Sequence, residues 1–228
     1  MDGNGRWAKS KGLERFFGHR QGTKATVATV EAGVDLGLEH LTLFVFSSEN
    51  WQRPKIEVDY LMGLLVEMVA QELPHLMEKN VRLKVIGNLE KLPEKPRKKL
   101  QEAIDKTAQN SGMQLNLAIS YGGRAEIVNA AQKIALAVAS GKLEVASIDE
   151  REFSKYLDLG GDFNTAPDPD LIIRTGGEYR LSNYLLWQAA YSEFFVSEVL
   201  WPNWTKDDFN KAVEFYKTRK RRFGKVEE

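Results

Sequence analysis

Short apolar runs rich in β-branched residues alternate along this chain with longer segments of helical periodicity, and this alternation restricts its fold more than any other feature. Residues 40–46 (HLTLFVF) are typical of a buried strand, and residues 57–79 are typical of a long helix. The pattern predicts further strands at 81–86, 113–120 and 170–174, and further helices at 93–109, at 124–140 and from about 205. This order indicates an α/β fold, a mostly parallel sheet with helices on both faces. The length suits a single domain over residues 1–228.

A glycine-rich segment at residues 2–6 departs from this order. Segments of this kind normally follow a strand in an open α/β sheet, and here no strand precedes it. We therefore expect the first strand of the sheet to be missing from the chain.

The composition argues against several classes of protein. The chain has 32 basic and 32 acidic residues, and this balance argues against a general nucleic-acid-binding protein. It has no cysteine, which excludes disulfides and thiolate metal sites and fits a reducing compartment. No apolar run reaches the roughly 18 residues of a membrane-spanning helix, and the polar start does not resemble a signal peptide. We expect a cytoplasmic protein.

Polar, glycine-bearing segments follow the predicted strands. They cover residues 47–53, 121–124 and 175–182, and residues 2–7 would join them if a strand preceded. Because ligands bind beyond the carboxyl ends of parallel strands, we expect these segments to converge on one edge of the sheet. Glycine lets backbone N–H groups approach an oxyanion, and arginine grips phosphate through two hydrogen bonds. Each segment alone could be a simple turn, but together they favour a phosphate-binding site.

The common nucleotide fingerprints do not explain these segments. The sequence contains no G-x-x-x-x-G-K-[ST], and residues 3–8 resemble only the front half of G-x-G-x-x-G. A Rossmann dehydrogenase is therefore a poor interpretation.

Five stretches instead resemble the cis-prenyltransferases, the family of undecaprenyl diphosphate synthases and their relatives. The run DGNGRWA at residues 2–8 resembles the family signature, and GHRQG at 18–22 resembles its GH-x-x-G. SSENWQRP at 47–54 resembles S-x-E-N-W-x-R-P, residues 170–193 resemble a second diphosphate site, and RFG at 222–224 matches a C-terminal R-x-G. The resemblance extends from Asp2 to Gly224 in the family's order.

The resemblance assigns roles to individual residues. It implies that Asp2 is a catalytic carboxylate that holds Mg²⁺ with help from Glu193, and that Asn50 removes a proton or relays it. It implies that the allylic diphosphate is held by Gly3, Asn4, Gly5, Arg6, Arg15, His19 and Arg53, with further substrate contacts from Ser47, Ser48 and Glu49. Trp7 and Trp51 would lie beside the reacting carbons. Isopentenyl diphosphate would be held by Arg174, Arg180, Leu181 and Ser182. Arg222 and Gly224 would complete that second site across a dimer interface.

The resemblance also implies an activity. It implies a Mg²⁺-dependent homodimer that condenses isopentenyl diphosphate with an allylic diphosphate, expected to be farnesyl diphosphate. The expected product is a long Z-polyprenyl diphosphate, such as the C55 cell-wall lipid carrier. An enzyme without a transmembrane segment, peripheral at the membrane surface, would hand this product to the membrane. The apolar helix at 57–79 would line the tunnel for this product or simply be a core helix.

Alternatives remain open at this stage. The chain could be a short-chain cis synthase, or a non-catalytic partner subunit of a two-component cis-prenyltransferase, although such partners typically lack the catalytic aspartate and much of the arginine set. A trans-prenyl synthase or terpene cyclase needs a D-D-x-x-D motif, and the only Asp-Asp pair, Asp207-Asp208, is not followed by one. A nucleic-acid-binding module is the weakest alternative.

Overall fold

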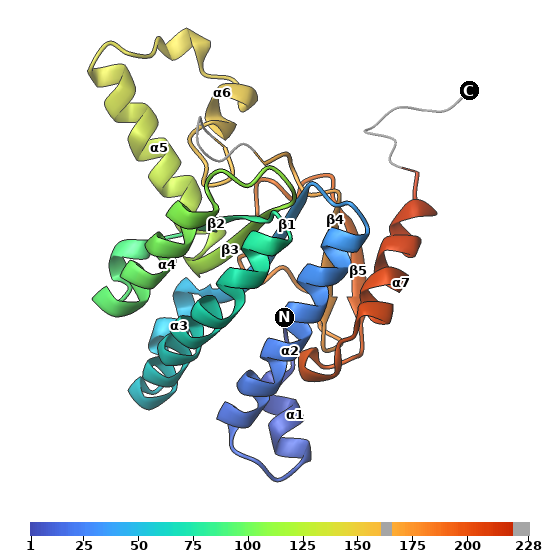
Figure 1. Ribbon diagram of the computed structural model, residues 1–228. Helices are drawn as coiled ribbons and strands as arrows, with labels where there is room; N and C mark the ends of the chain where they lie inside the picture. The colour runs from blue at the N-terminus through green and yellow to red at the C-terminus, as the bar shows by residue number, and fades with distance from the viewer. Residues whose placement is uncertain (161–165, 221–228) are drawn as a thin grey trace.

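Every strand pair in the described part of the chain is parallel, as the alternation of strands and helices predicts. The computed structural model describes residues 1–160 and 166–220 (Figure 1). The strands are β1 His40–Ser47, β2 Arg82–Ile86, β3 Gln114–Tyr121, β4 Leu171–Thr175 and β5 Glu193–Ser197. They form a three-stranded sheet of order β1-β3-β2 and a two-stranded sheet β4-β5. The predicted α/β fold with a parallel sheet is confirmed.

Helices cover the two sheets and join them. The helices are α1 Asn4–Ser10, α2 Arg15–Asp35, α3 Lys55–Glu78, α4 Glu94–Thr107, α5 Gly123–Ala139, α6 Glu150–Ser154 and α7 Lys206–Lys217, with short 3₁₀ turns η1 Ser48–Gln52, η2 Leu89–Lys91, η3 Val145–Ser147 and η4 Trp201–Asn203. Helices α3 and α4 pack beside β2, and α7 packs beside β5. Helix α2 contacts both α3 and α7 and so connects the two sheets, while α5 extends away from the body of the molecule (Figure 1).

The core is built around β3. All eight residues of this strand are buried, because β3 has a neighbouring strand on each side and helices above and below. Leu115, Leu117 and Ile119 pack against apolar residues of α3 and α4. The residues between them include Gln114, Asn116 and Ser120, which are polar but buried as well, so the strand is covered on both faces.

Helix α2 and strand β5 are not among the elements predicted from the sequence. Helix α2 contains Gly18 and Gly22, which disfavour a helix, but one turn apart they leave room for close packing. A Cβ at Gly18 would lie 2.0 Å from the Asn4 carbonyl oxygen, and one at Gly22 would lie 2.8 Å from the Trp201 ring. The glycine pair therefore lets α1 and η4 pack directly on α2.

The two sheets face each other across a gap. Strands β1 and β4 are not hydrogen-bonded to each other and line opposite sides of a cavity of about 1090 Å³. Met1 lies at the cavity and packs against the core clusters of both sheets. The polar carboxyl ends of β1 and β4 form the mouth of the cavity.

Candidate active site

Asp2 is held in place at the carboxyl end of β4. Its backbone N–H donates to Thr175 Oγ1 at 2.9 Å, and the Thr175 hydroxyl donates back to the Asp2 carbonyl at 3.0 Å. The Gly3 N–H donates to Asp2 Oδ1 at 2.7 Å, and the backbone of Gly3 then turns into α1 with φ 107°, in the left-handed region. A side chain at Gly3 would also collide with Leu200, 2.8 Å away. Glycine is thus needed here for both conformation and space.

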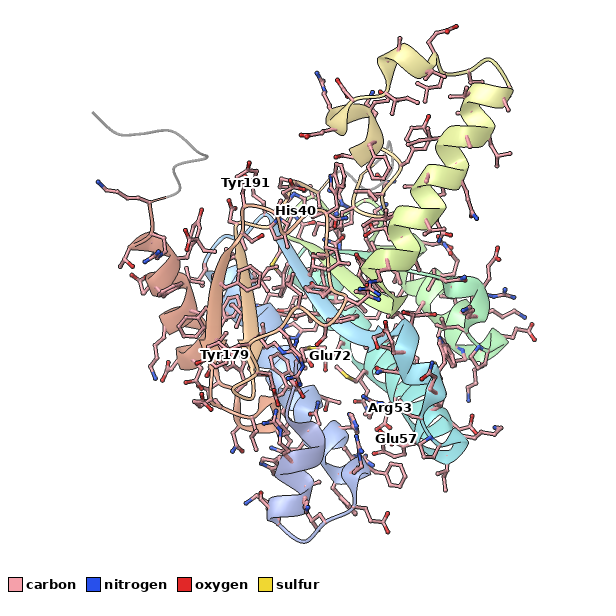
Figure 2. All side chains as sticks on the ribbon, turned by 180° about the vertical axis from the view of Figure 1, so that it is seen from behind. His40, Arg53, Glu57, Glu72, Tyr179 and Tyr191 are labelled. Carbon is pink, nitrogen blue, oxygen red and sulfur yellow. The ribbon has the colours of Figure 1, made fainter. Side chains whose placement is uncertain are left out.

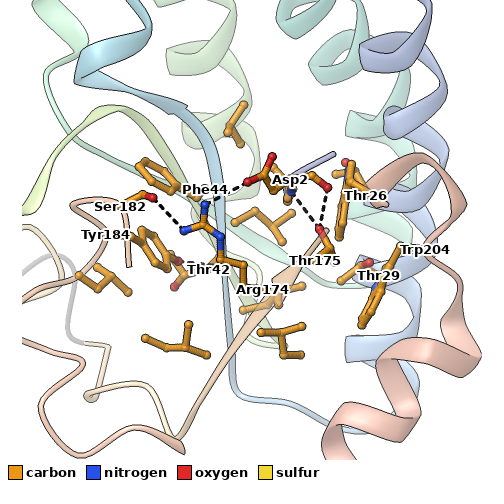
Figure 3. A pocket seen from close by; sticks show the side chains of 18 of the residues that line it. Asp2, Thr26, Thr29, Thr42, Phe44, Arg174, Thr175, Ser182, Tyr184 and Trp204 are labelled. Carbon is orange, nitrogen blue, oxygen red and sulfur yellow. Dashed lines mark hydrogen bonds and ion pairs between the residues drawn. The ribbon is translucent and has the colours of Figure 1, made fainter. Parts of the chain in front are cut away.

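Arg174 connects Asp2 to the loop that follows β4. Its guanidinium donates to Asp2 Oδ2 at 3.0 Å, to Ser182 Oγ at 2.9 Å and to the Arg180 carbonyl (Figure 3). Burial alone would raise the pKa of Asp2, but the hydrogen bonds from Arg174 and Gly3 outweigh it, so the pKa lies below its usual value. Asp2 is therefore an ionised carboxylate at the cavity mouth.

Glu178 links two arginines that the sequence assigns to different substrates. Its carboxylate lies 3.2 Å from Arg6 and also pairs with Arg180. Arg6 in turn lies 3.8 Å from Asp2. Gly176, at φ 84°, allows this approach, because a Cβ there would lie 2.6 Å from Arg6. The sequence analysis assigned no role to Glu178.

A second basic cluster surrounds Glu57 at the start of α3. Arg53, Arg15 and His19 approach the same carboxylate oxygen at 3.0, 3.6 and 3.7 Å. Figure 2 shows Arg53 and Glu57 side by side. Burial, followed by the charge of Arg53, lowers the pKa of His19 to about 4, so His19 is neutral near pH 7. The sequence analysis did not single out Glu57.

The loop after β1 is ordered by its own hydrogen bonds. The Ser47 N–H donates to Asn50 Oδ1 at 3.1 Å, and the Ser47 hydroxyl accepts from the Asn50 N–H in return. Ser48 donates to Glu49, and Asn183 donates to Glu49 at 2.7 Å. The loop that follows β1 is thereby fixed to the loop that follows β4.

The structure brings most of the expected site residues to one cavity. Of the residues assigned from the sequence, the cavity is lined by Asp2, Gly3, Asn4, Gly5, Arg15, His19, Ser47, Asn50, Arg53, Arg174, Arg180, Leu181 and Ser182. Arg6, Ser48 and Glu49 lie beside it through the pairings described above. Arg222 and Gly224 lie outside the described residues.

Both tryptophans expected beside the reacting carbons have partners outside the cavity lining. Trp7 turns toward η4, where its ring N–H donates to Asn203 at 2.7 Å. Trp51 packs edge-on against Phe46 and donates to Ser120 at 2.9 Å. Neither ring lines the cavity, because each is held by a partner behind it.

In one folded chain, the side chains of Glu193 and Asp2 lie far apart in space. The parallel register pairs Glu193 with Leu171 and Ser197 with Thr175, so Glu193 lies about 13 Å along the strands from the end where Asp2 lies. In Figure 2 the neighbouring Tyr191 lies at the end of the molecule opposite Arg53 and Glu57. Arg219 donates to Glu193 at 3.1 Å. A metal ion shared by Asp2 and Glu193 of one chain is therefore excluded by the register.

The residues that remain fit Mg²⁺ only in part. Each Asp2 oxygen accepts one hydrogen bond and retains lone pairs for a hard cation. Within residues 1–160 and 166–220, no group of three His, Cys, Asp or Glu side chains is placed to hold a metal. The chain thus offers one carboxylate, and diphosphate oxygens and water would supply the other ligands.

An apolar cavity of about 110 Å³ adjoins the site between α2, α3 and the three-stranded sheet. It shares Met1, Thr26, Leu65 and Met68 with the larger cavity, and its wall is otherwise almost entirely apolar. Helix α3 therefore packs with Val69 and Leu76 on the sheet and also lines this cavity. The core-helix interpretation of its broad apolar surface is thus confirmed, and the product tunnel stays a prediction. In the described ranges of the chain, every helix is too short or too polar to cross a bilayer.

Paired basic clusters beside an apolar cavity define an α/β protein that is suited to binding a diphosphate with an apolar tail. The family described as "Putative undecaprenyl diphosphate synthase" matches residues 1–224, and the chain belongs to this family of cis-prenyltransferases. It is a prenyltransferase of the undecaprenyl diphosphate synthase type.

Similar proteins agree with this assignment. The isoprenyl transferase of Agrobacterium fabrum is 50% identical over all of this chain and 91% of its own length. That of Thermotoga maritima is 49% identical over 98% of this chain and 94% of its own length.

Solved structures agree too. Lavandulyl diphosphate synthase from Lavandula x intermedia, solved with dimethylallyl diphosphate, superposes with a TM-score of 0.95 at 35% identity, covering 99% of this chain and 95% of that one. A probable undecaprenyl diphosphate synthase from Campylobacter jejuni has a TM-score of 0.78 at 39% identity, covering 90% and 93%.

Proposed function

We propose that this prenyltransferase condenses isopentenyl diphosphate with farnesyl diphosphate to form a long Z-polyprenyl diphosphate, such as the C55 cell-wall lipid carrier, with Mg²⁺ as cofactor. The observation that supports this most directly is the pair of basic clusters at one cavity mouth. Arg15, His19 and Arg53 form one, and Arg174 and Arg180 belong to the other. The bacterial relatives at 47–50% identity are named isoprenyl transferases.

The two clusters suit a reaction between two diphosphates. Breaking the allylic C–O bond leaves negative charge on the departing diphosphate, and fixed arginines stabilise such charge in the transition state. The double bond of isopentenyl diphosphate then attacks the allylic carbon, and a proton leaves. Holding the two anions side by side brings the reacting carbons together and lowers the entropic part of the barrier.

Asn50 is suited to orienting a proton acceptor. Its amide oxygen already accepts from the Ser47 N–H, so the NH₂ group is the side that can meet a substrate. An amide does not take a proton near neutral pH, but it can donate to a diphosphate oxygen or a water that does. We therefore assign proton transfer to that acceptor.

Mg²⁺ would bind the Asp2 carboxylate together with diphosphate oxygens. When bound, it would supply positive charge that stabilises the leaving diphosphate. Thr175 and Gly3 hold Asp2, and Arg174 keeps it ionised, so the protein would present one fixed carboxylate to the ion.

A homodimer would explain the residues that lie away from the site. Val128 and Leu136 on α5 are 55% and 70% exposed, which supports an interface there. Glu193 pairs with Arg219, three residues before Arg222. We propose that Glu193, Arg222 and Gly224 act in the neighbouring subunit's site, and that the enzyme works in the cytoplasm at the membrane surface where its product is used.

The central experiment supplies farnesyl diphosphate, radiolabelled isopentenyl diphosphate and Mg²⁺ and separates products by chain length. Long-chain products that disappear with a chelator support the proposal. Products of a single condensation would show a short-chain synthase, and no incorporation by a folded protein would favour a non-catalytic partner subunit.

Subunit mixing tests the shared site. Arg222→Ala and Asp2→Ala chains, each inactive alone, should regain part of the activity when mixed, because one site per heterodimer keeps both groups. No recovery under conditions where the subunits exchange would exclude a site that takes Asp2 from one chain and Arg222 from its partner.

A further inference from the structure

Glu57 is an acidic residue at the centre of a basic cluster. Its side chain is only 8% exposed, and a buried carboxylate is costly unless cations and hydrogen bonds compensate. One oxygen meets three groups from different parts of the chain: Arg15 at the start of α2, His19 one turn later, and Arg53 in front of α3. The carboxylate thus holds together side chains that otherwise have no common support.

We propose that Glu57 is a positioning residue that gathers Arg15, His19 and Arg53 into one diphosphate-binding cluster before the substrate arrives. This inference rests on the proposed function, because the ligand is the diphosphate of the allylic substrate. Two arginines close together repel each other, and the anion between them removes that repulsion. The hydrogen bond from Arg53 at 3.0 Å also fixes the plane of its guanidinium.

The cluster also contains an unpaired polar atom. His19 Nε2 is buried and, among the described residues, has no hydrogen-bond partner. It lies 3.7 Å from Glu57, which is too far for a hydrogen bond. A phosphate oxygen that entered between Arg15 and Arg53 would satisfy this atom, because both arginines meet the same Glu57 oxygen. By holding the two arginines, Glu57 therefore determines where a phosphate oxygen can reach the unpaired His19 Nε2.

Glu67 provides a matched control. It pairs with Arg20 at 3.4 Å, so it also links α3 to α2 through an arginine–carboxylate pair. That pair is 65% and 44% exposed, and neither residue lines the cavity. Replacing Glu67 by Gln tests what the loss of a helix-to-helix ion pair does by itself.

The experiment measures binding of farnesyl thiolodiphosphate, an unreactive allylic analogue, by titration calorimetry. Glu57→Gln should weaken binding by about tenfold, the usual effect of removing one charge-assisted contact, whereas Glu67→Gln should leave it unchanged. Arg53→Gln should weaken binding similarly, and the double variant should be no weaker than Arg53→Gln, because Glu57 acts through Arg53. Unchanged or tighter binding by Glu57→Gln, or additive losses, would overturn the proposal.

A second variant covers the case in which Glu57→Gln does not fold. Glu57→Asp keeps the charge but shortens the side chain, so it should raise the KM for the allylic substrate several-fold and leave that for isopentenyl diphosphate unchanged. An equal rise in both would indicate a merely structural role and refute the inference. If the unmodified protein neither binds the analogue nor turns over substrate, the proposed function fails, which is a separate result.

Discussion

Acid should destabilise this protein in part through one histidine. His19 is 15% exposed, and burial with the nearby charge of Arg53 lowers its pKa to about 4 from an ordinary 6.5. Between these two values the unfolded chain binds a proton that the folded chain does not. Unfolding is therefore favoured as the pH falls from about 6.5 to about 4, and the difference is worth about 3 kcal/mol.

The measurement compares urea unfolding of the unmodified protein and of His19→Gln at several pH values. The unmodified protein should lose about 2–3 kcal/mol more unfolding free energy than the variant between about pH 7 and pH 4.5. Carboxylates that titrate in the same range contribute to both proteins and cancel in the comparison. Tryptophan fluorescence and circular dichroism should report the same transition if unfolding is two-state.

His75→Gln is the matched control. His75 lies on α3, is 33% exposed and is not part of the cluster around Glu57, so its replacement shows what the loss of a histidine outside this cluster does. If the unfolding free energies of the unmodified protein and His19→Gln run parallel across this range, the folded protein does not hold His19 neutral, and the reasoning is refuted.

The remaining predictions concern the site. Asp2→Asn should lower turnover by at least about 100-fold with the thermal midpoint unchanged, because it removes the carboxylate that faces the leaving diphosphate; a variant with most of its activity would exclude Asp2 from that role. Thr175→Val keeps the shape but removes both hydrogen bonds to the Asp2 backbone, so unfolding should become easier by about 1–3 kcal/mol and turnover should fall; denaturant titration with an unchanged free energy would contradict this. Arg174→Gln should raise the KM of both substrates about 10- to 100-fold because Arg174 contacts Asp2 as well as Ser182, whereas Arg180→Gln should affect isopentenyl diphosphate alone; equal effects from both would be inconsistent with this geometry. Val30→Phe should shorten the products seen by chromatography, because it fills the apolar cavity between α2 and α3; products of unchanged length would place the growing chain elsewhere.

Hydrophobic pattern was sufficient to locate the strands that hold the site. Residues 113–120 place apolar residues at every second position, as in Leu115, Leu117 and Ile119, and this period of two predicts a strand; β3 covers 114–121. Helix α2 could not be found in this way, because its glycines and β-branched residues carry weak helix propensity. Its stability comes from α1, α3, η4 and α7 packed around it, which is tertiary information that no local window contains.

The site shows the same division between local and long-range information. The arginines were found because they occur in recognisable motifs, whereas Glu57 and Glu178 stand outside the residues to which those motifs assign roles. A local signal did exist for Glu57, which follows Arg53 by four residues and can therefore share a helix face with it. The position of Glu193 depends on strand register, which the motifs do not contain. Parallel pairing places the start of β5, where Glu193 lies, beside the start of β4 and away from the end where Asp2 lies.

The carboxylates explain how two clusters of cations can exist at one cavity before any anion binds. Asp2 and Glu178 neutralise the cluster around Arg174, and Glu57 neutralises the other. Each arginine must therefore exchange a carboxylate for a phosphate when substrate arrives. Because the arginines are already paired in the free protein, the binding of phosphate gains only the difference in Coulomb energy between the two partners. That exchange takes up part of the binding energy, and at Glu57 the orientation that the carboxylate gives to Arg15 and Arg53 before the substrate arrives outweighs this loss. An enzyme that extends a chain repeatedly must release pyrophosphate after every condensation, and carboxylates that take the arginines back make that release easier.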